Sequence, residues 1–242
     1  ADILGPGANN AVPAAINVGT MNEVNADAIS VANPTWHGTP WEGSSGLAGA
    51  LIGDQSMNPP AQIRIGKMNF SIPDIPSPLP TGNGIDLVGT LYHEMGHALG
   101  ISSLALVGED DDGNPVYGFD TEISPWDRHL VDRYGVTPTT DMEVVRSEPE
   151  TAPGADPVFT VGEMTESGVL FKGTHVSEVL AGALNGGLPI EGFEGDSLDL
   201  SHIELDRSLM SHQDYRNYQV FMEAELAALQ DIGYTIDRKN FY

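Results

Sequence analysis

The chain has 242 residues, with 35 aspartates and glutamates against 10 lysines and arginines, and its formal net charge is −25. This balance disfavours a nucleic-acid partner, because phosphate binding requires clustered basic side chains. The absence of cysteine excludes disulfides, thiolate metal ligands and a cysteine nucleophile. No apolar run approaches the roughly 18 residues that a spanning helix needs, so we expect no membrane span.

The first 84 residues are rich in glycine, asparagine and proline and contain only short apolar segments. Residues 14–21 (AAINVGTM) and 61–70 (AQIRIGKMNF) are predicted to be strands, the second because apolar and polar side chains alternate in it. Between them, residues 26–33 (ADAISVAN) are predicted to form a short helix.

A longer helix is predicted around residues 90–103 (TLYHEMGHALGISS). Apolar side chains recur there at helical spacing, and Gly100 can end the helix. His93 and His97 would lie roughly 40° apart around the helix axis, one turn apart, so both can bind one metal ion. Glu94 would project toward the open side of such a site, where a carboxylate can accept a proton from a metal-bound water.

The alternative is a buried helix that carries two histidines by chance. The apolar context of the helix, with Gly100 three residues after His97, favours the metal site. A catalytic zinc ion usually takes three protein ligands and keeps its fourth position for water. A third ligand must therefore come from another part of the chain.

Weaker signals lie between residues 101 and 200. The segment 110–114 (DDDGN) alternates oxygen ligands around a glycine, like the first half of an EF-hand loop, but the glutamate that completes such a loop is missing. It could hold Ca²⁺, and a plain solvated turn is the alternative. Residues 124–135 (SPWDRHLVDRYG) are predicted to form a helix with His129 on its surface or in its packing. His175 is expected near the start of another helix.

Two further features complete the chain. His37, in a stretch rich in glycine and proline, is expected to be a loop residue. Residues 218–236 (YQVFMEAELAALQDIGYTI) have the apolar spacing of a terminal helix that stops at Gly233.

The pattern H-E-x-x-H-x-x-G at residues 93–100 resembles the metzincin clan of zinc peptidases. The third histidine of the simple metzincin pattern is replaced here by Ser103. Leishmanolysin-type metzincins have a long insertion at this point, and their third ligand arrives later, in a Ser-His segment ahead of a methionine turn. Residues 200–212 (LSHIELDRSLMSH) resemble that segment, with His202 as the displaced ligand and residues 208–211 as the Met-turn.

The resemblance implies an α+β fold of the metzincin-like zincin type, with one catalytic domain in two parts. Residues 1–100 would form an N-terminal subdomain, a twisted sheet with the active-site helix. Residues 101–242 would form a C-terminal subdomain with the insertion, the third ligand, the Met-turn and the terminal helix. Residues 61–70 would be the edge strand that pairs with an extended peptide beside the cleft.

The function implied is that of a zinc-dependent endopeptidase. His93, His97 and His202 would hold Zn²⁺, and Glu94 would activate the zinc-bound water that attacks the peptide bond. Met210 would pack below the ligands without coordinating the metal. The alternative is a catalytically inactive surface adhesion or binding module on a metzincin scaffold. Zinc-dependent hydrolysis of a non-peptide amide also remains open.

His212 is a further candidate catalytic residue, because astacin- and serralysin-like metzincins have a tyrosine two residues after the Met-turn methionine. Its imidazole could donate a hydrogen bond to the developing oxyanion, or it could replace His202 as the third ligand. Tyr215 could fill the oxyanion role if the turn is longer, and a solvent-facing His212 is the other alternative.

The expected partner is a protein or peptide substrate, and we expect a monomer. We also expect a secreted or cell-surface bacterial protein, and a processed or excised domain because the chain begins at Ala1.

Overall fold

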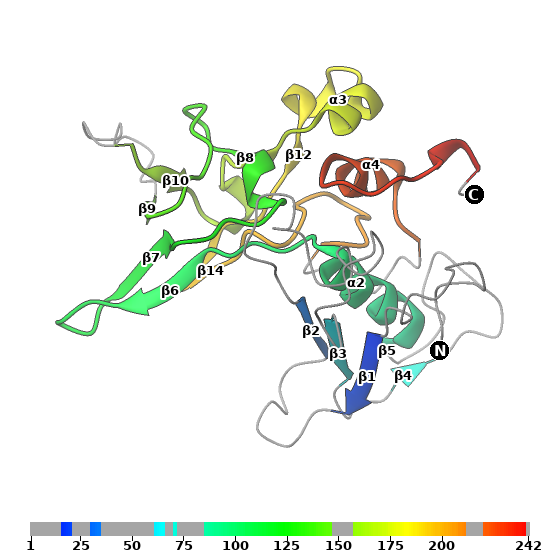
Figure 1. Ribbon diagram of the computed structural model, residues 1–242, viewed down its shortest axis with the longest axis horizontal. Helices are drawn as coiled ribbons and strands as arrows, with labels where there is room; N and C mark the ends of the chain where they lie inside the picture. Colours follow the sequence, from blue (N-terminus) through cyan, green and yellow to red (C-terminus); the bar gives the residue numbers. More distant parts are fainter. Residues whose placement is uncertain are drawn as a thin grey trace.

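The computed structural model describes residues 16–20, 30–34, 61–65, 70–71, 85–146, 157–211 and 220–240. These residues form a mixed α+β fold, as the sequence predicts (Figure 1). The helices are α2 (Leu87–Leu99), α3 (Thr174–Leu180) and α4 (Glu223–Asp231). The strands are β1 (Ile16–Thr20), β2 (Ser30–Pro34), β3 (Ala61–Ile65), β4 (Phe70–Ser71), β5 (Ile85–Asp86), β6 (Leu106–Glu109), β7 (Pro115–Phe119), β8 (Leu130–Val131), β9 (Met142–Arg146), β10 (Phe159–Val161), β11 (Leu170–Phe171), β12 (Leu188–Pro189), β13 (Phe193–Glu194) and β14 (Ser197–Leu198).

The N-terminal sheet has the strand order β1-β3-β2. Strand β3 is central, parallel to β1 and antiparallel to β2, so both of its sides take part in strand pairing. The prediction of an edge strand at residues 61–70 is therefore wrong, because order along the chain does not fix order in the sheet. The predicted helix at residues 26–33 is also wrong where it is described, since Ser30–Pro34 is strand β2.

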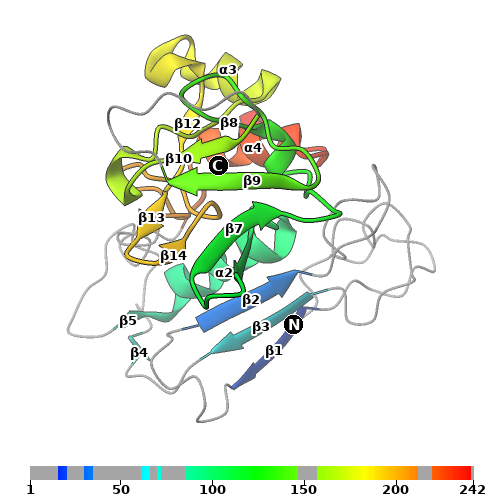
Figure 2. The same ribbon diagram turned by 90° about the vertical axis from the view of Figure 1, so that its left-hand side faces the viewer.

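Helix α2 lies between this sheet and the C-terminal elements (Figures 1 and 2). It ends as predicted at Gly100, whose φ of 112° suits glycine. The N–H of Gly100 donates to His97 O at 2.9 Å, and the N–H of Ile101 donates to Gly96 O at 3.1 Å. This pair of bonds is the Schellman motif, and it turns the chain sharply after the second histidine.

The C-terminal part contains a four-stranded sheet of order β10-β9-β7-β6 and a three-stranded sheet of order β12-β11-β8. Its core is aromatic, and the rings of Trp126 and Phe171, both fully buried, lie 4.3 Å apart between centroids. The indole Nε1–H of Trp126 donates to Leu200 O at 2.8 Å. The core thereby anchors the chain two residues before His202.

The predicted helix at residues 124–135 is wrong. The structure has a short 3₁₀ turn at Asp127–His129 followed by strand β8. The Asp132 carboxylate accepts the N–H groups of Tyr134 and Val136 at 2.9 and 2.8 Å. An aspartate that bonds to nearby N–H groups in this way competes with helix formation.

Helices α3 and α4 pack together and confirm two predictions. His175 lies in the first turn of α3, and α4 stops before Gly233, which has a φ of 119°. Asp231 at the end of α4 accepts the N–H groups of His175 and Val176, each at 2.9 Å, and so caps α3. Among the described residues, no helix combines the length and apolar character needed to cross a membrane.

Candidate metal centre

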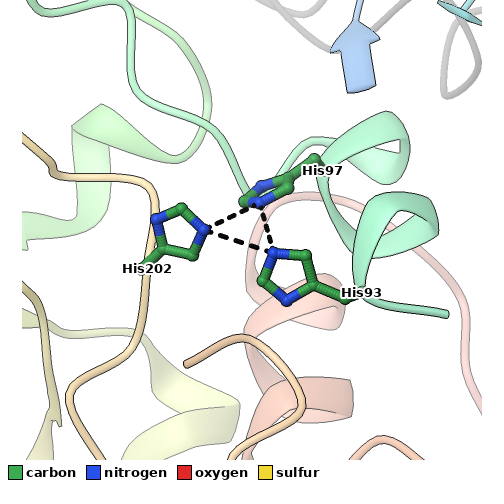
Figure 3. A group of neighbouring side chains, drawn as sticks. All are labelled: His93, His97 and His202. Carbon is green, nitrogen blue, oxygen red and sulfur yellow. Dashed lines mark hydrogen bonds between the residues drawn. The ribbon is translucent and has the colours of Figure 1, made fainter. Parts of the chain in front are cut away.

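Three histidines from two distant segments meet at one point (Figure 3). His93 and His97 come from successive turns of α2, and His202 comes from the loop after β14. Their Nε2 atoms lie 3.1 Å apart between His93 and His97, 3.1 Å between His97 and His202, and 3.2 Å between His93 and His202. The structure thus brings together the three residues predicted as metal ligands.

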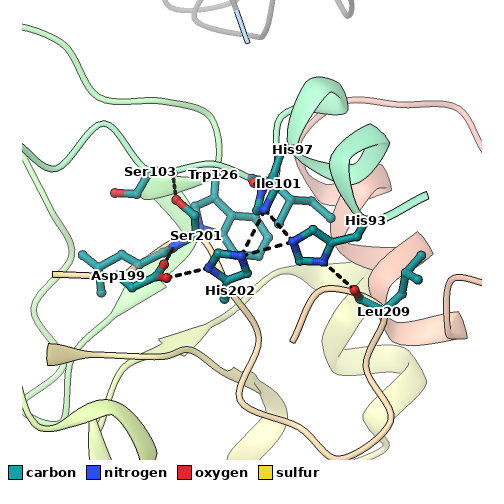
Figure 4. Close-up of polar contacts among 10 residues, drawn as sticks. His93, His97, Ile101, Ser103, Trp126, Asp199, Ser201, His202 and Leu209 are labelled. Atoms are coloured by element: carbon teal, nitrogen blue, oxygen red, sulfur yellow. Dashed lines mark hydrogen bonds and ion pairs between the residues drawn. The ribbon is translucent and has the colours of Figure 1, made fainter. Parts of the chain in front are cut away.

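The other ring nitrogen of each histidine is held by an oxygen atom (Figure 4). Nδ1 lies 2.7 Å from Leu209 O in His93 and 2.7 Å from Ile101 O in His97. A carbonyl oxygen can only accept, so both Nδ1 atoms must carry the hydrogen.

The Nδ1 atom of His202 also carries the hydrogen, and its acceptor is a charged side chain. This Nδ1 lies 2.6 Å from Asp199 Oδ2, and a carboxylate is also an acceptor. In the neutral rings, all three Nε2 atoms therefore carry no hydrogen and direct their lone pairs toward one point. A hydrogen bond between two of these Nε2 atoms requires a proton on one of them, which makes that ring an imidazolium.

This arrangement fits a small tetrahedral cation. Two nitrogen ligands at 2.0–2.1 Å from a tetrahedral zinc ion lie about 3.3 Å apart, close to the observed separations of 3.1 to 3.2 Å. Metal-binding histidines usually donate the remaining N–H to a carbonyl or carboxylate, which fixes the tautomer and the ring direction. All three rings meet this condition.

The end of α2 supplies one of these supports. The Schellman motif at Gly100 directs the Ile101 carbonyl to His97. Two residues on, the N–H of Ser103 donates to Ser201 Oγ at 3.0 Å. Ser103, which occupies the position of the third histidine in the simple motif, therefore ties the end of the helix to the segment that carries His202.

Asp199 and His202 form a partly buried, hydrogen-bonded pair, which becomes an ion pair when the His202 ring is protonated. Burial by itself would raise the pKa of Asp199, but the charge of His202, their hydrogen bond and the N–H of Ser201 lower it to about 2. Burial likewise would lower the pKa of His202, but Asp199, with smaller contributions from Glu191 and Glu94, raises it above its usual value. The negative charge around the site attracts a cation, and a proton competes with a metal ion for His202.

Glu94 is almost fully buried, with 4% of its surface exposed, and His93 beside it is 3% exposed. Its charge acts on His202, since it contributes to the raised pKa of that ring. A buried carboxylate whose charge acts on His202 is suited to accept a proton from water at this site.

Met210, in the segment after His202, is fully buried. A side chain on Gly96, between the two helical histidines, would overlap Met210 Sδ and lie only 3.0 Å from its Cε. The thioether therefore packs against the backbone of α2 at Gly96. This contact does not place Met210 relative to the three rings, so its expected position below the ligands remains a prediction.

The remaining histidines are not part of the cluster where they are described. His129 lies near the carbonyls of Lys172 and Asp231, at 3.0 Å each, and His175 lies 3.6 Å from Glu178. His37, His212 and Tyr215 lie outside the described residues, so the expected roles of His212 and Tyr215 remain predictions.

The segment 110–114 forms an exposed turn between β6 and β7. The Asp110 carboxylate accepts the N–H groups of Asp112 and Asn114 and the amide of the Asn114 side chain. In the described ranges, two groups of side chains could hold a metal ion, namely His93-His97-His202 and Glu191-Asp199-His202. The turn contributes to neither, so calcium there remains a prediction.

Several supporting groups were not predicted. Asp199 stands three residues before His202, and a carboxylate at that spacing is a signal that the sequence offers. Glu191 is fully buried and belongs to the second group of potential ligands. Its N–H donates to His202 O at 3.1 Å, and this contact depends on tertiary structure, so no local pattern indicates it.

Comparison with protein-family models, with curated proteins and with solved structures finds no match for this chain.

Proposed function

We propose that this protein is a zinc-dependent endopeptidase of the metzincin type. The observation that carries the proposal is the convergence of three Nε2 atoms at 3.1 to 3.2 Å, with each Nδ1 held by an acceptor. Neutral imidazoles without thiolates suit zinc among the common metals of proteins. The sequence adds Glu94 beside the first ligand, and the packed Met210 is consistent with the resemblance to a Met-turn.

The bound metal would supply a Lewis acid that polarises a carbonyl group and increases the acidity of water. His93, His97 and His202 would orient it through rings that are fixed at Nδ1. The Glu94 carboxylate would accept the proton from the attacking water and pass it to the leaving amine. Burial of Glu94 keeps its carboxylate away from bulk solvent.

The test compares zinc-loaded wild type with Glu94→Gln on a quenched-fluorescent peptide library. We expect the variant to keep its zinc and to lose activity by about 10²- to 10⁴-fold, the range for general-base catalysis. Glu109→Gln, a change on the exposed strand β6, is the matched control and should remain active.

Other outcomes separate the alternatives. A zinc-loaded wild type that cleaves no peptide would contradict the proposal and favour a non-catalytic binding module. Turnover of small amide substrates with no cleavage of the library would favour hydrolysis of a non-peptide amide.

A further inference from the structure

Glu225, in the first turn of α4, is a carboxylate that is fully buried. Its Oε1 accepts the hydroxyl of Ser208 at 2.6 Å and the N–H of Met210 at 2.9 Å. Its Oε2 accepts the N–H of Met222 at 2.6 Å. One side chain thus joins the start of the helix to the turn that carries Met210.

Helix capping alone does not account for this residue. In a capping box, a glutamate at the third helical position accepts the N–H of the residue before the helix, and the bond from Met222 N to Oε2 fulfils that role. Capping boxes need neither burial nor a second partner segment. Removing a carboxylate from water is costly unless donors replace the water, and Ser208 and Met210 supply them to Oε1.

The turn that Glu225 holds contacts helix α2 in two ways. The Leu209 carbonyl accepts the Nδ1–H of His93 at 2.7 Å, and Figure 4 shows Leu209 directly beside this ring. The Met210 thioether packs against Gly96. Both Leu209 and Met210 are fully buried, so neither contact can shift without moving its neighbours.

We propose that Glu225 is a positioning residue of the metal centre, which fixes the turn at residues 208–210 so that Leu209 O orients His93 for metal binding. The inference rests on the metal site of the proposed function, and it is independent of peptidase activity. It assigns to α4 a role in the affinity of the site, although α4 supplies none of the three ligands.

The three rings provide an internal control, because each Nδ1 has a different support. Ile101 O, which supports His97, belongs to the end of α2, and Asp199 supports His202 from its own loop. Loss of Glu225 should therefore disturb His93 and leave His97 unchanged. A general loss of packing would disturb both.

The test uses Glu225→Gln in the full chain, with two readouts. The first is zinc affinity, by competition with a chromophoric chelator, and we expect a weakening of up to about tenfold, because Leu209 O is displaced and not removed, whereas removal of a ligand's own partner costs about tenfold to hundredfold. The second is the ¹⁵N resonance pattern of the histidine rings in the metal-free protein, where the His93 Nδ1–H signal should shift or exchange faster than that of His97.

The matched control is Glu223→Gln, on the same helix turn, where Glu223 is exposed and lies 3.5 Å from Arg238. It should leave both readouts unchanged. Ser208→Ala is the second variant, to be used if Glu225→Gln does not fold. It removes one donor to Glu225 Oε1 and should disturb the His93 ring in the same direction.

Unchanged zinc affinity and an unchanged His93 ring in folded Glu225→Gln would overturn the proposal, as would an equal disturbance of His93 and His97. If Glu225→Gln does not fold, an unchanged His93 ring in Ser208→Ala would overturn it as well. A wild type that binds no zinc would instead count against the proposed function, and the ring signals of the metal-free protein would still test the role of Glu225.

Discussion

Replacing Gly96 by alanine should fail to stabilise this protein, although the same change stabilises most helices. At an exposed helical position, glycine to alanine gains about 1 kcal/mol. Here the new Cβ would overlap Met210 Sδ and lie 3.2 Å from Phe221 Cε1. Met210 is fully buried and Phe221 is 6% exposed, so overpacking should cost about 1 to 3 kcal/mol.

The two effects can be separated by a double-mutant cycle. Met210→Val removes the sulfur and the methyl group that the new Cβ would meet and leaves Phe221 Cε1 as the close contact, so in that background Gly96→Ala should stabilise by up to about 1 kcal/mol. In the wild-type background the net effect should range from neutral to a loss of about 2 kcal/mol. The coupling energy between the two sites should therefore be about 1 to 3 kcal/mol.

The assay is urea unfolding followed by far-UV circular dichroism, with excess EDTA so that metal binding does not contribute to stability. If Gly96→Ala stabilises the wild type as much as it stabilises Met210→Val, then Met210 does not pack against α2 as described.

Three further predictions concern carboxylates. Asp199→Ala should weaken zinc binding about tenfold to hundredfold, because it removes the support of His202, whereas the exposed Asp206→Ala should not; a chelator competition assay measures both. Asp231→Ala should cost about 0.5 to 2 kcal/mol in urea unfolding through loss of the α3 cap, with zinc affinity retained. For Glu225, burial raises the pKa from its ordinary 4.5 to about 7, against the opposing hydrogen bonds from Ser208, Met210 and Met222. The folded state then holds the Glu225 proton to higher pH than the unfolded chain, so protonated Glu225 contributes fully to the free energy of unfolding below pH 4.5, and about 3 kcal/mol of this contribution is lost as the pH rises to about 7. The difference in free energy of unfolding between wild type and Glu225→Gln should change by that amount over this pH range, and a constant difference would refute the prediction.

The helices that carry or flank the site could be predicted because their signals are local. In α2 and α4, apolar side chains recur at helical spacing and a glycine follows at the left-handed position, Gly100 and Gly233. The His93–His97 pair then follows from helix geometry alone. Such features need no knowledge of the rest of the fold.

The errors arise where tertiary contacts override local patterns. Ser124 and Pro125 are typical of the start of a helix, but Leu130–Val131 pairs with β11 and Asp132 bonds to the following N–H groups. Ser30–Pro34 is a strand because it pairs with β3. Neither partner strand is adjacent in sequence, so local sequence patterns do not indicate these strand pairings.

The third ligand shows the same limit within the site. The resemblance of its segment to a known motif is what points to His202, because a histidine 105 residues after His97 has no spacing that indicates a shared ion. Glu225 and Ser208 lie 17 residues apart, and no pattern in the sequence couples them. The supports of the ligands are therefore harder to predict than the ligands.

The most direct test of the metal centre is the zinc content of the purified protein after dialysis against a zinc buffer, measured for wild type, His202→Ala and His175→Ala. We expect about one zinc ion per chain in the wild type and in His175→Ala, and loss of this zinc in His202→Ala, because two remaining histidines bind a tetrahedral ion weakly. A wild type without zinc, or a His202→Ala variant that keeps it as tightly as the wild type, would contradict the account.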